Sequence, residues 1–217
     1  MRQLALAVIV LAAALAAPPV TPTPFGAGQA RAADLDLPIP DGYCPLSKLR
    51  FRKLMIKGGN GFATSNFDLR QLATFADCRK CDEWPSERPC SSGYGLYLEN
   101  PGAAFLTGLP RAEFLERIEQ TFGIDQPPRA SVTAATLEPG GGAVSLGVLH
   151  RDDVAAYVGY VHRDSHAAQA WISLMGYTLV GERLILLKLG APYHDETTIQ
   201  ELLNVQATNL KRIVELN

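Results

Sequence analysis

Four strand-like segments follow one another in the C-terminal half of the chain, and the links between them are too short to hold a helix. The segments are residues 143–150, 154–162, 169–179 and 183–191. Consecutive strands with such short links form antiparallel pairs, because a parallel crossover needs a dozen residues or more. The sequence therefore predicts an antiparallel meander.

Two amphipathic helices can cover this sheet. The segment 184–189 is apolar on both faces of its pleat, so both faces of the sheet need cover. A helix over 198–216 carries one apolar stripe, made by Ile199, Leu202, Leu203, Leu210, Ile213 and Val214. Asp195 or Thr198 can cap it, and Thr198 with Glu201 fits a capping box. A second helix over 110–122 begins at Pro110 and ends at Gly123.

These patterns predict an α+β fold in which helices cover an antiparallel meander sheet and the C-terminal amphipathic helix packs on it. Residues 68–78, 93–99 and 131–137 add three strand patterns. Residues 48–57 fit either a helix or a strand.

The N-terminus predicts export. An apolar run from Leu4 to Ala17 precedes Ala30-Arg31-Ala32, which has the small residues of a signal-peptidase site. The run is shorter than the roughly 20 residues that span a bilayer. We expect a signal peptide at residues 1–33, an extended leader at 34–40, and a single domain at 41–217 with a cysteine-rich loop at 78–92. The expected location is periplasmic or secreted.

The charge of the remaining chain argues against nucleic acid as a partner. Residues 1–33 contain two arginines and no acidic residue, so 18 basic and 22 acidic residues remain, a net charge near −4. Nucleic-acid binding needs a basic surface. We expect instead a protein or another component of the cell envelope as the partner.

Four cysteines are present, which in an exported protein predicts two disulfides. They are Cys44, Cys78, Cys81 and Cys90. Three pairings are open to them, and we favour Cys44–Cys78 with Cys81–Cys90. The first would join the start of the domain to the end of a strand, and the second would close a short loop.

The motif Cys78-Arg79-Lys80-Cys81 allows a different interpretation. Two basic residues between the cysteines favour a thiolate, so the pair could serve thiol–disulfide exchange. No parallel βαβ pattern surrounds the motif, and a structural disulfide is the preferred interpretation. A thiol–disulfide redox protein using Cys78 and Cys81 is the alternative function.

Histidines cluster at one predicted turn. His162 and His166 flank Asp164, and imidazole with carboxylate is a common ligand set for divalent metals. No third ligand is fixed by spacing, so a polar surface turn is preferred over this metal-site alternative. We expect neither a metal nor another cofactor.

Positive charge concentrates near the start of the domain. Lys48, Arg50, Arg52 and Lys53 alternate with apolar residues, and no acidic residue interrupts them. Such a segment can be a solvated face, or it can contact an acidic partner or an anionic membrane surface. These four residues are the candidate partner-binding residues.

The segment from Gly176 to Leu187, then Ala191-Pro192-Tyr193 and the helix at 198–216, resembles the closing section of the PsbP-like fold. The segments Gly42–Pro45 and Phe75–Cys78 are similar to those of exported bacterial proteins of unknown function. The resemblance covers residues 131–217 and implies a non-catalytic binding or assembly module, with no catalytic motif to transfer. Together with the predicted export, this favours a non-enzymatic binding or accessory protein of the envelope.

Overall fold

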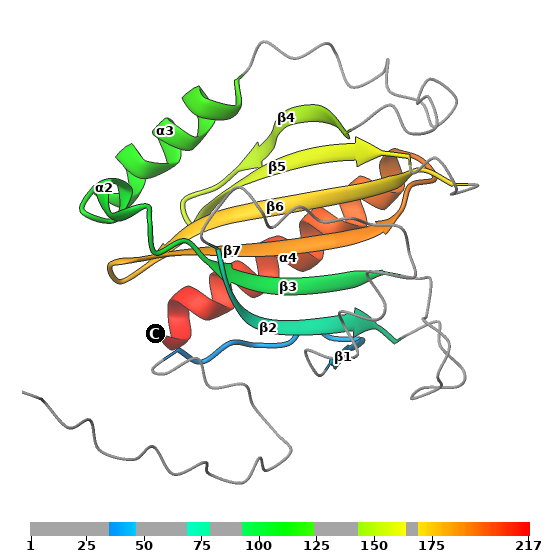
Figure 1. The fold of residues 1–217 in the computed structure, drawn as a ribbon, viewed down its shortest axis with the longest axis horizontal. Coiled ribbons are helices and arrows are strands. Elements are labelled where there is room, and N and C mark those ends of the chain that lie inside the picture. Colours follow the sequence, from blue (N-terminus) through cyan, green and yellow to red (C-terminus); the bar gives the residue numbers. More distant parts are fainter. Residues whose placement is uncertain (1–34, 47–68, 79–92, 124–142, 164–168) are drawn as a thin grey trace, which may run out of the picture.

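The computed structural model describes residues 35–46, 69–78, 93–123, 143–163 and 169–217 (Figure 1). Its strands are β1 (Tyr43–Pro45), β2 (Arg70–Asp77), β3 (Tyr94–Glu99), β4 (Ala143–Arg151), β5 (Ala155–His162), β6 (Trp171–Val180) and β7 (Arg183–Pro192). Its helices are α2 (Ala104–Thr107), α3 (Arg111–Phe122) and α4 (Glu196–Leu216). In these residues no helix is both long enough and apolar enough to cross a membrane.

The described strands form one antiparallel sheet in the order β1-β2-β3-β7-β6-β5-β4. The meander from β4 to β7 confirms the predicted hairpins. Its first turn is fixed by Asp152, whose Oδ1 accepts hydrogen bonds from the backbone N–H groups of Val154 and Ala155 at 2.8 and 2.7 Å. The sequence did not predict that β3 pairs with β7, which joins β1–β3 to the meander.

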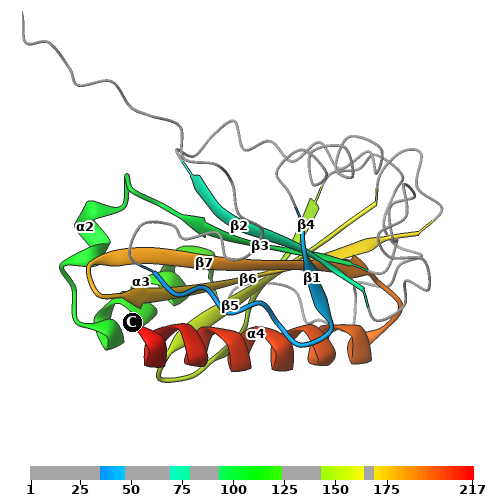
Figure 2. The same ribbon diagram turned by 90° about the horizontal axis from the view of Figure 1, so that it is seen from below.

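One face of the sheet, called here the first face, is covered by α4 (Figure 2). The helix lies close to β6 because Gly176 has no side chain. A Cβ atom at that position would lie 2.5 Å from Leu210 Cδ1. The buried amide of Gln206 donates to the backbone oxygens of Leu174 on β6 and Leu187 on β7, at 3.0 and 2.5 Å. These contacts fasten α4 to the two central strands of the meander.

The opposite face, called here the second face, is covered at one end by α3. Phe114, Leu115 and Ile118 are buried there against the sheet. The centroids of the Phe122 and Tyr177 rings lie 5.2 Å apart. Arg151 at the end of β4 forms an ion pair with Glu119 of α3. Helices therefore pack on both faces of the sheet, and the α+β class with a C-terminal helix on the sheet is confirmed.

The N-terminal cap of α4 is Asp195, whose side chain accepts hydrogen bonds from the backbone of Thr197 and Thr198. Thr198 lies inside the helix, so the predicted capping box with Glu201 is not formed. Asp195 is the cap because its carboxylate accepts hydrogen bonds from two of the free N–H groups in the first turn.

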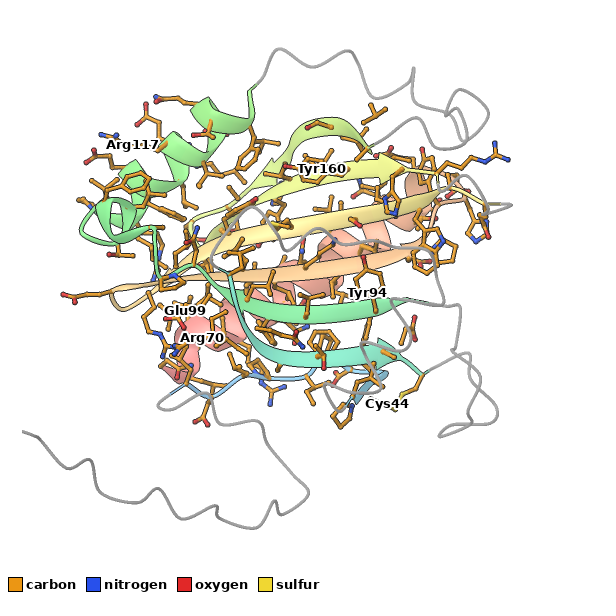
Figure 3. All side chains as sticks on the ribbon, viewed as in Figure 1. Cys44, Arg70, Tyr94, Glu99, Arg117 and Tyr160 are labelled. Atoms are coloured by element: carbon orange, nitrogen blue, oxygen red, sulfur yellow. A yellow bond between two sulfur atoms is a disulfide. The ribbon has the colours of Figure 1, made fainter. Side chains whose placement is uncertain are left out.

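An ion cluster fixes the end of β3 near α2. Glu99 accepts a hydrogen bond from Arg183 Nε on β7 at 2.8 Å and contacts Arg70 on β2 (Figure 3). The hydrogen bond from Arg183 lowers the pKa of the Glu99 carboxyl group more than the contact with Arg70 does. The cluster therefore ties three neighbouring strands together.

Candidate binding site on the second face of the sheet

The Cys44–Cys78 disulfide is present and joins β1 to the residue that follows β2, with Cα atoms 5.8 Å apart. It confirms the first favoured pair. The C-x-x-C alternative requires the sulfur atom of Cys78, which this disulfide occupies. Thiol–disulfide exchange with Cys81 would first have to break the Cys44–Cys78 bond. Cys81 and Cys90 lie outside the described residues, and their pairing stays a prediction.

The other predicted site residues are only partly described. Lys48, Arg50, Arg52 and Lys53 lie outside the described residues, as do Asp164 and His166. His162 ends β5, where it pairs in register with Trp171. In the part of the chain that the structure describes, no three potential metal ligands lie together. The metal-site alternative stays a prediction.

A cluster of polar and aromatic side chains lies on the second face, beyond the end that α3 covers. Tyr94 on β3, Ser173 on β6 and Lys188 on β7 form its polar part, and each is at least 95% buried. We call these three residues the polar cluster. Figure 3 places Tyr94 at the end of β3 opposite to Glu99, away from α3.

Tyr94 lies flat across β7 because its partner in register is Gly190. A Cβ atom at Gly190 would lie 2.6 Å from the Cζ of Tyr94 and 2.9 Å from its hydroxyl oxygen. Since Gly190 also pairs with Ser173, the Tyr94 hydroxyl extends toward β6. The Tyr94 ring stacks on the ring of Trp171, with centroids 6.1 Å apart.

Lys188 supplies an amine to this cluster. Its Nζ lies 5.7 Å from the centroid of the Tyr94 ring, a distance typical of cation–π contacts. Burial lowers the pKa of this amine to about 7, because a charged ammonium loses its hydration there. The side chain is 2% exposed.

The Ser173 hydroxyl is the least satisfied group of the cluster. A side-chain hydrogen bond between Ser173 and Tyr94 opposes the effect of burial, which raises the pKa of Tyr94 to about 12. This contact is poorly aligned, and Ser173 Oγ has no other hydrogen-bond partner in the described part of the chain.

Three half-buried side chains border the polar cluster. Tyr160, Trp171 and Met175 pack against the buried core of the second face, yet each remains partly accessible. The arrangement places convergent polar groups beside an apolar border on a rigid sheet, and it is the candidate site within the described residues.

Sequence reasoning did not identify this cluster. Aromatic residues such as Trp171 and Tyr160 on a predicted strand fit a core or a sheet surface, and Ser173 has no sequence signature. Lys188 carries the one sequence signal of the cluster, because it places a charge inside the apolar segment 184–189, and charged residues are rarely buried.

Comparisons with known proteins give little guidance. No family model matches the chain, and no curated protein matches it. A solved structure of LpqN, involved in cell envelope biogenesis of Mycobacterium tuberculosis, is similar with a TM-score of 0.33 and 12% identity, over 83% of each chain. A likeness of this size supports no inference about function.

Proposed function

We propose that this chain is an exported, non-enzymatic binding or accessory protein of the cell envelope, located in the periplasm or secreted. The Cys44–Cys78 disulfide is the observation that carries the proposal. Disulfides persist in oxidising compartments and are rare in the cytosol. The signal peptide predicted over residues 1–33 supports the same location.

The second face of the sheet supports the binding role. Its polar cluster is held by three strands that pair continuously, so its side chains are preorganised. A further contact with a protein partner or an anionic membrane surface would use the basic residues Lys48, Arg50, Arg52 and Lys53. This surface rests on the sequence pattern alone.

Export is tested by expressing residues 1–217 in a bacterium that has a periplasm. We expect a periplasmic product that lacks about the first 33 residues, as the cleavage signature predicts. Intact mass under non-reducing conditions should be lower than that of the reduced chain by four hydrogen atoms. A Leu11→Arg variant, which interrupts the apolar run, is the control and should stay in the cytosol. An uncleaved, fully reduced wild-type chain in the cytosol would contradict the proposal.

Partner contact is tested by photo-crosslinking in living cells, with the crosslinker placed at Lys53. Replacing Lys48, Arg50 and Arg52 by serine should remove the adduct, because the proposed contact is electrostatic. The same crosslinker at Lys211, on exposed α4 surface, is the control position. An adduct that survives the three replacements would remove the basic segment from the proposal.

The redox alternative makes the opposite prediction in an insulin-reduction assay. Because Cys78 is bonded to Cys44, we expect no catalytic turnover by the wild-type protein. A Cys44→Ser variant releases the Cys78 thiol and shows whether the assay would detect activity. Turnover by the wild type would favour an oxidoreductase over a binding protein.

A further inference from the structure

The described fold begins with a packed segment that closely follows the predicted signal peptide. We call residues 35–46 the N-terminal arm. Leu35 is 7% exposed and belongs to the same buried cluster as Ile213 of α4. Pro38 and Pro40 are also buried, and Figure 2 shows the arm beginning beside the end of α4. The arm is therefore part of the first face of the fold from its first residue.

Hydrogen bonds hold the backbone at the start of the arm. The Asp36 N–H group donates to Asn217 Oδ1 at 2.9 Å, and Asn217 Nδ2 donates to the Asp36 carbonyl oxygen at 3.1 Å. This reciprocal pair uses the two backbone groups that an extended peptide offers to a neighbouring strand. Further along the arm, the buried Tyr97 hydroxyl donates to the carbonyl oxygen of Pro38 at 2.8 Å. The backbone groups next to Leu35 are therefore already engaged.

A disulfide secures the other end of the arm. β1 pairs with β2 over 3 residues, and Cys44 on β1 is bonded to Cys78. The Tyr43 ring also packs edge-on against the Phe75 ring, with centroids 5.4 Å apart. Because the disulfide keeps β1 beside β2, residues 35–40 stay close to their positions when they separate from the sheet, and they return quickly.

The predicted cleavage site lies next to this packed segment. Cleavage after Ala33 makes Asp34 the first residue of the mature chain, and the buried Leu35 follows it. Neighbouring Cα atoms are about 3.8 Å apart, so Leu35 lies within about 8 Å of Ala33. Extended peptides are recognised through main-chain hydrogen bonds and through pockets for alternate side chains. Leu35 cannot fill such a pocket while it is buried, and the Asp36 N–H group is already bonded to Asn217.

We propose that the N-terminal arm is a strap that closes on the first face only after the signal peptide has been removed. This inference rests on the proposed export and gives the order of its steps. The arm is still undocked when the peptidase adds water across the bond between Ala33 and Asp34, which frees a carboxylate on Ala33 and an amine on Asp34. The arm then packs against the sheet and α4. A precursor that folds first is resistant to the peptidase, so it keeps its signal peptide.

The test measures how fast a purified bacterial signal peptidase cleaves the folded, disulfide-bonded precursor, residues 1–217, in detergent. The comparison is a precursor with about ten Gly and Ser residues inserted between Asp34 and Leu35, which moves the bond away from the docked arm. We expect the wild-type precursor to be cleaved at least about thirtyfold more slowly, because only molecules with a separated arm are substrates. Peptides with the two sequences around the bond give the intrinsic rates, against which each precursor is normalised. Equal normalised rates for the two folded precursors would overturn the proposal.

Two variants loosen the arm and leave the sequence around the bond intact. Asn217→Ala removes both hydrogen bonds to Asp36, and it should raise the cleavage rate of the folded precursor about fivefold. Replacing Cys44 and Cys78 together by serine releases the other end of the arm and should raise the rate about tenfold. Glu215→Ala, on the exposed surface of α4, is the control and should leave the rate unchanged. Wild-type rates in both arm variants would show that docking does not protect the bond, and would refute the strap.

The N-terminus of the exported protein is an independent readout. Mass spectrometry should find that the mature chain begins within residues 30–34, as the cleavage signature predicts. A mature chain that begins further upstream would place the cleaved bond beyond the reach of the docked arm, and this result would contradict the inference. Export is judged separately. A folded precursor that is cleaved rapidly refutes the strap alone, whereas an uncleaved chain in the cytosol refutes the proposed export.

Discussion

Replacing Lys188 by methionine should stabilise the protein, and the stabilisation should depend on pH. Methionine fills a similar volume without a charge. The amine titrates near pH 7 in the folded protein and at 10.5 in its ordinary state. Each unit of difference corresponds to about 1.4 kcal/mol, so burying the charged amine costs about 5 kcal/mol.

The sign follows from the proton balance. Below pH 7 the amine is charged in both the folded and the unfolded state, and the fold carries the whole penalty. Between pH 7 and 10.5 the unfolded chain binds more protons, so the penalty shrinks and wild-type stability rises with pH. Subtracting about 1 kcal/mol for the lost contact with the Tyr94 ring, we expect Lys188→Met to gain about 4 kcal/mol at pH 6. At pH 9 the folded amine is neutral and has no cation–π contact to lose, so the gain should fall to about 2 kcal/mol.

The assay is urea unfolding under non-reducing conditions at pH 6, 7.5 and 9, followed by circular dichroism. The difference between variant and wild type is the measured quantity, so the titration of tyrosines that both proteins share cancels to a first approximation. Lys211→Met is the matched control and should give a difference near zero at every pH. A destabilised Lys188→Met protein at pH 6, or a difference that does not change with pH, would refute the reasoning.

Two further changes test the geometry around the site and the covalent link. Gly190→Ala should lower the free energy of unfolding by about 1–3 kcal/mol, because its Cβ would overlap the Tyr94 ring, whereas Gly108→Ala, with no atom within 4 Å, should change it little. Equal effects of the two would show that Tyr94 does not lie across β7. Replacing Cys44 and Cys78 together by serine should cost about 3–4 kcal/mol in chemical unfolding, the value for a crosslink that closes 34 residues. A loss below about 1 kcal/mol would mean that this bond adds little to the stability of the fold.

The meander and its helices were predictable because their signals are local. Alternation within each strand, short links and a helical stripe all lie within a few residues of one another. The pairing of β3 with β7 was not predictable in this way, since Glu99 and its partner Ile185 are far apart in sequence. Two of the expected segments, 48–57 and 131–137, fall outside the described residues.

The candidate site was harder to predict, because its members come from three strands. Ser173 becomes notable only once its buried hydroxyl is known to lie beside that of Tyr94, which comes from another strand. Tyr94 joins the cluster because Gly190, on another strand, leaves space for its ring. Lys188 alone carried a sequence signal, as a charge inside an apolar segment.

The amide of Gln206 has a consequence for motion. Because it donates to one backbone oxygen on β6 and another on β7, α4 cannot separate from the sheet without uncovering both acceptors. We therefore expect the slowest hydrogen exchange in α4, β6 and β7, with one shared opening free energy. Local opening should then be more frequent on the face that carries α3 than on the face that carries α4.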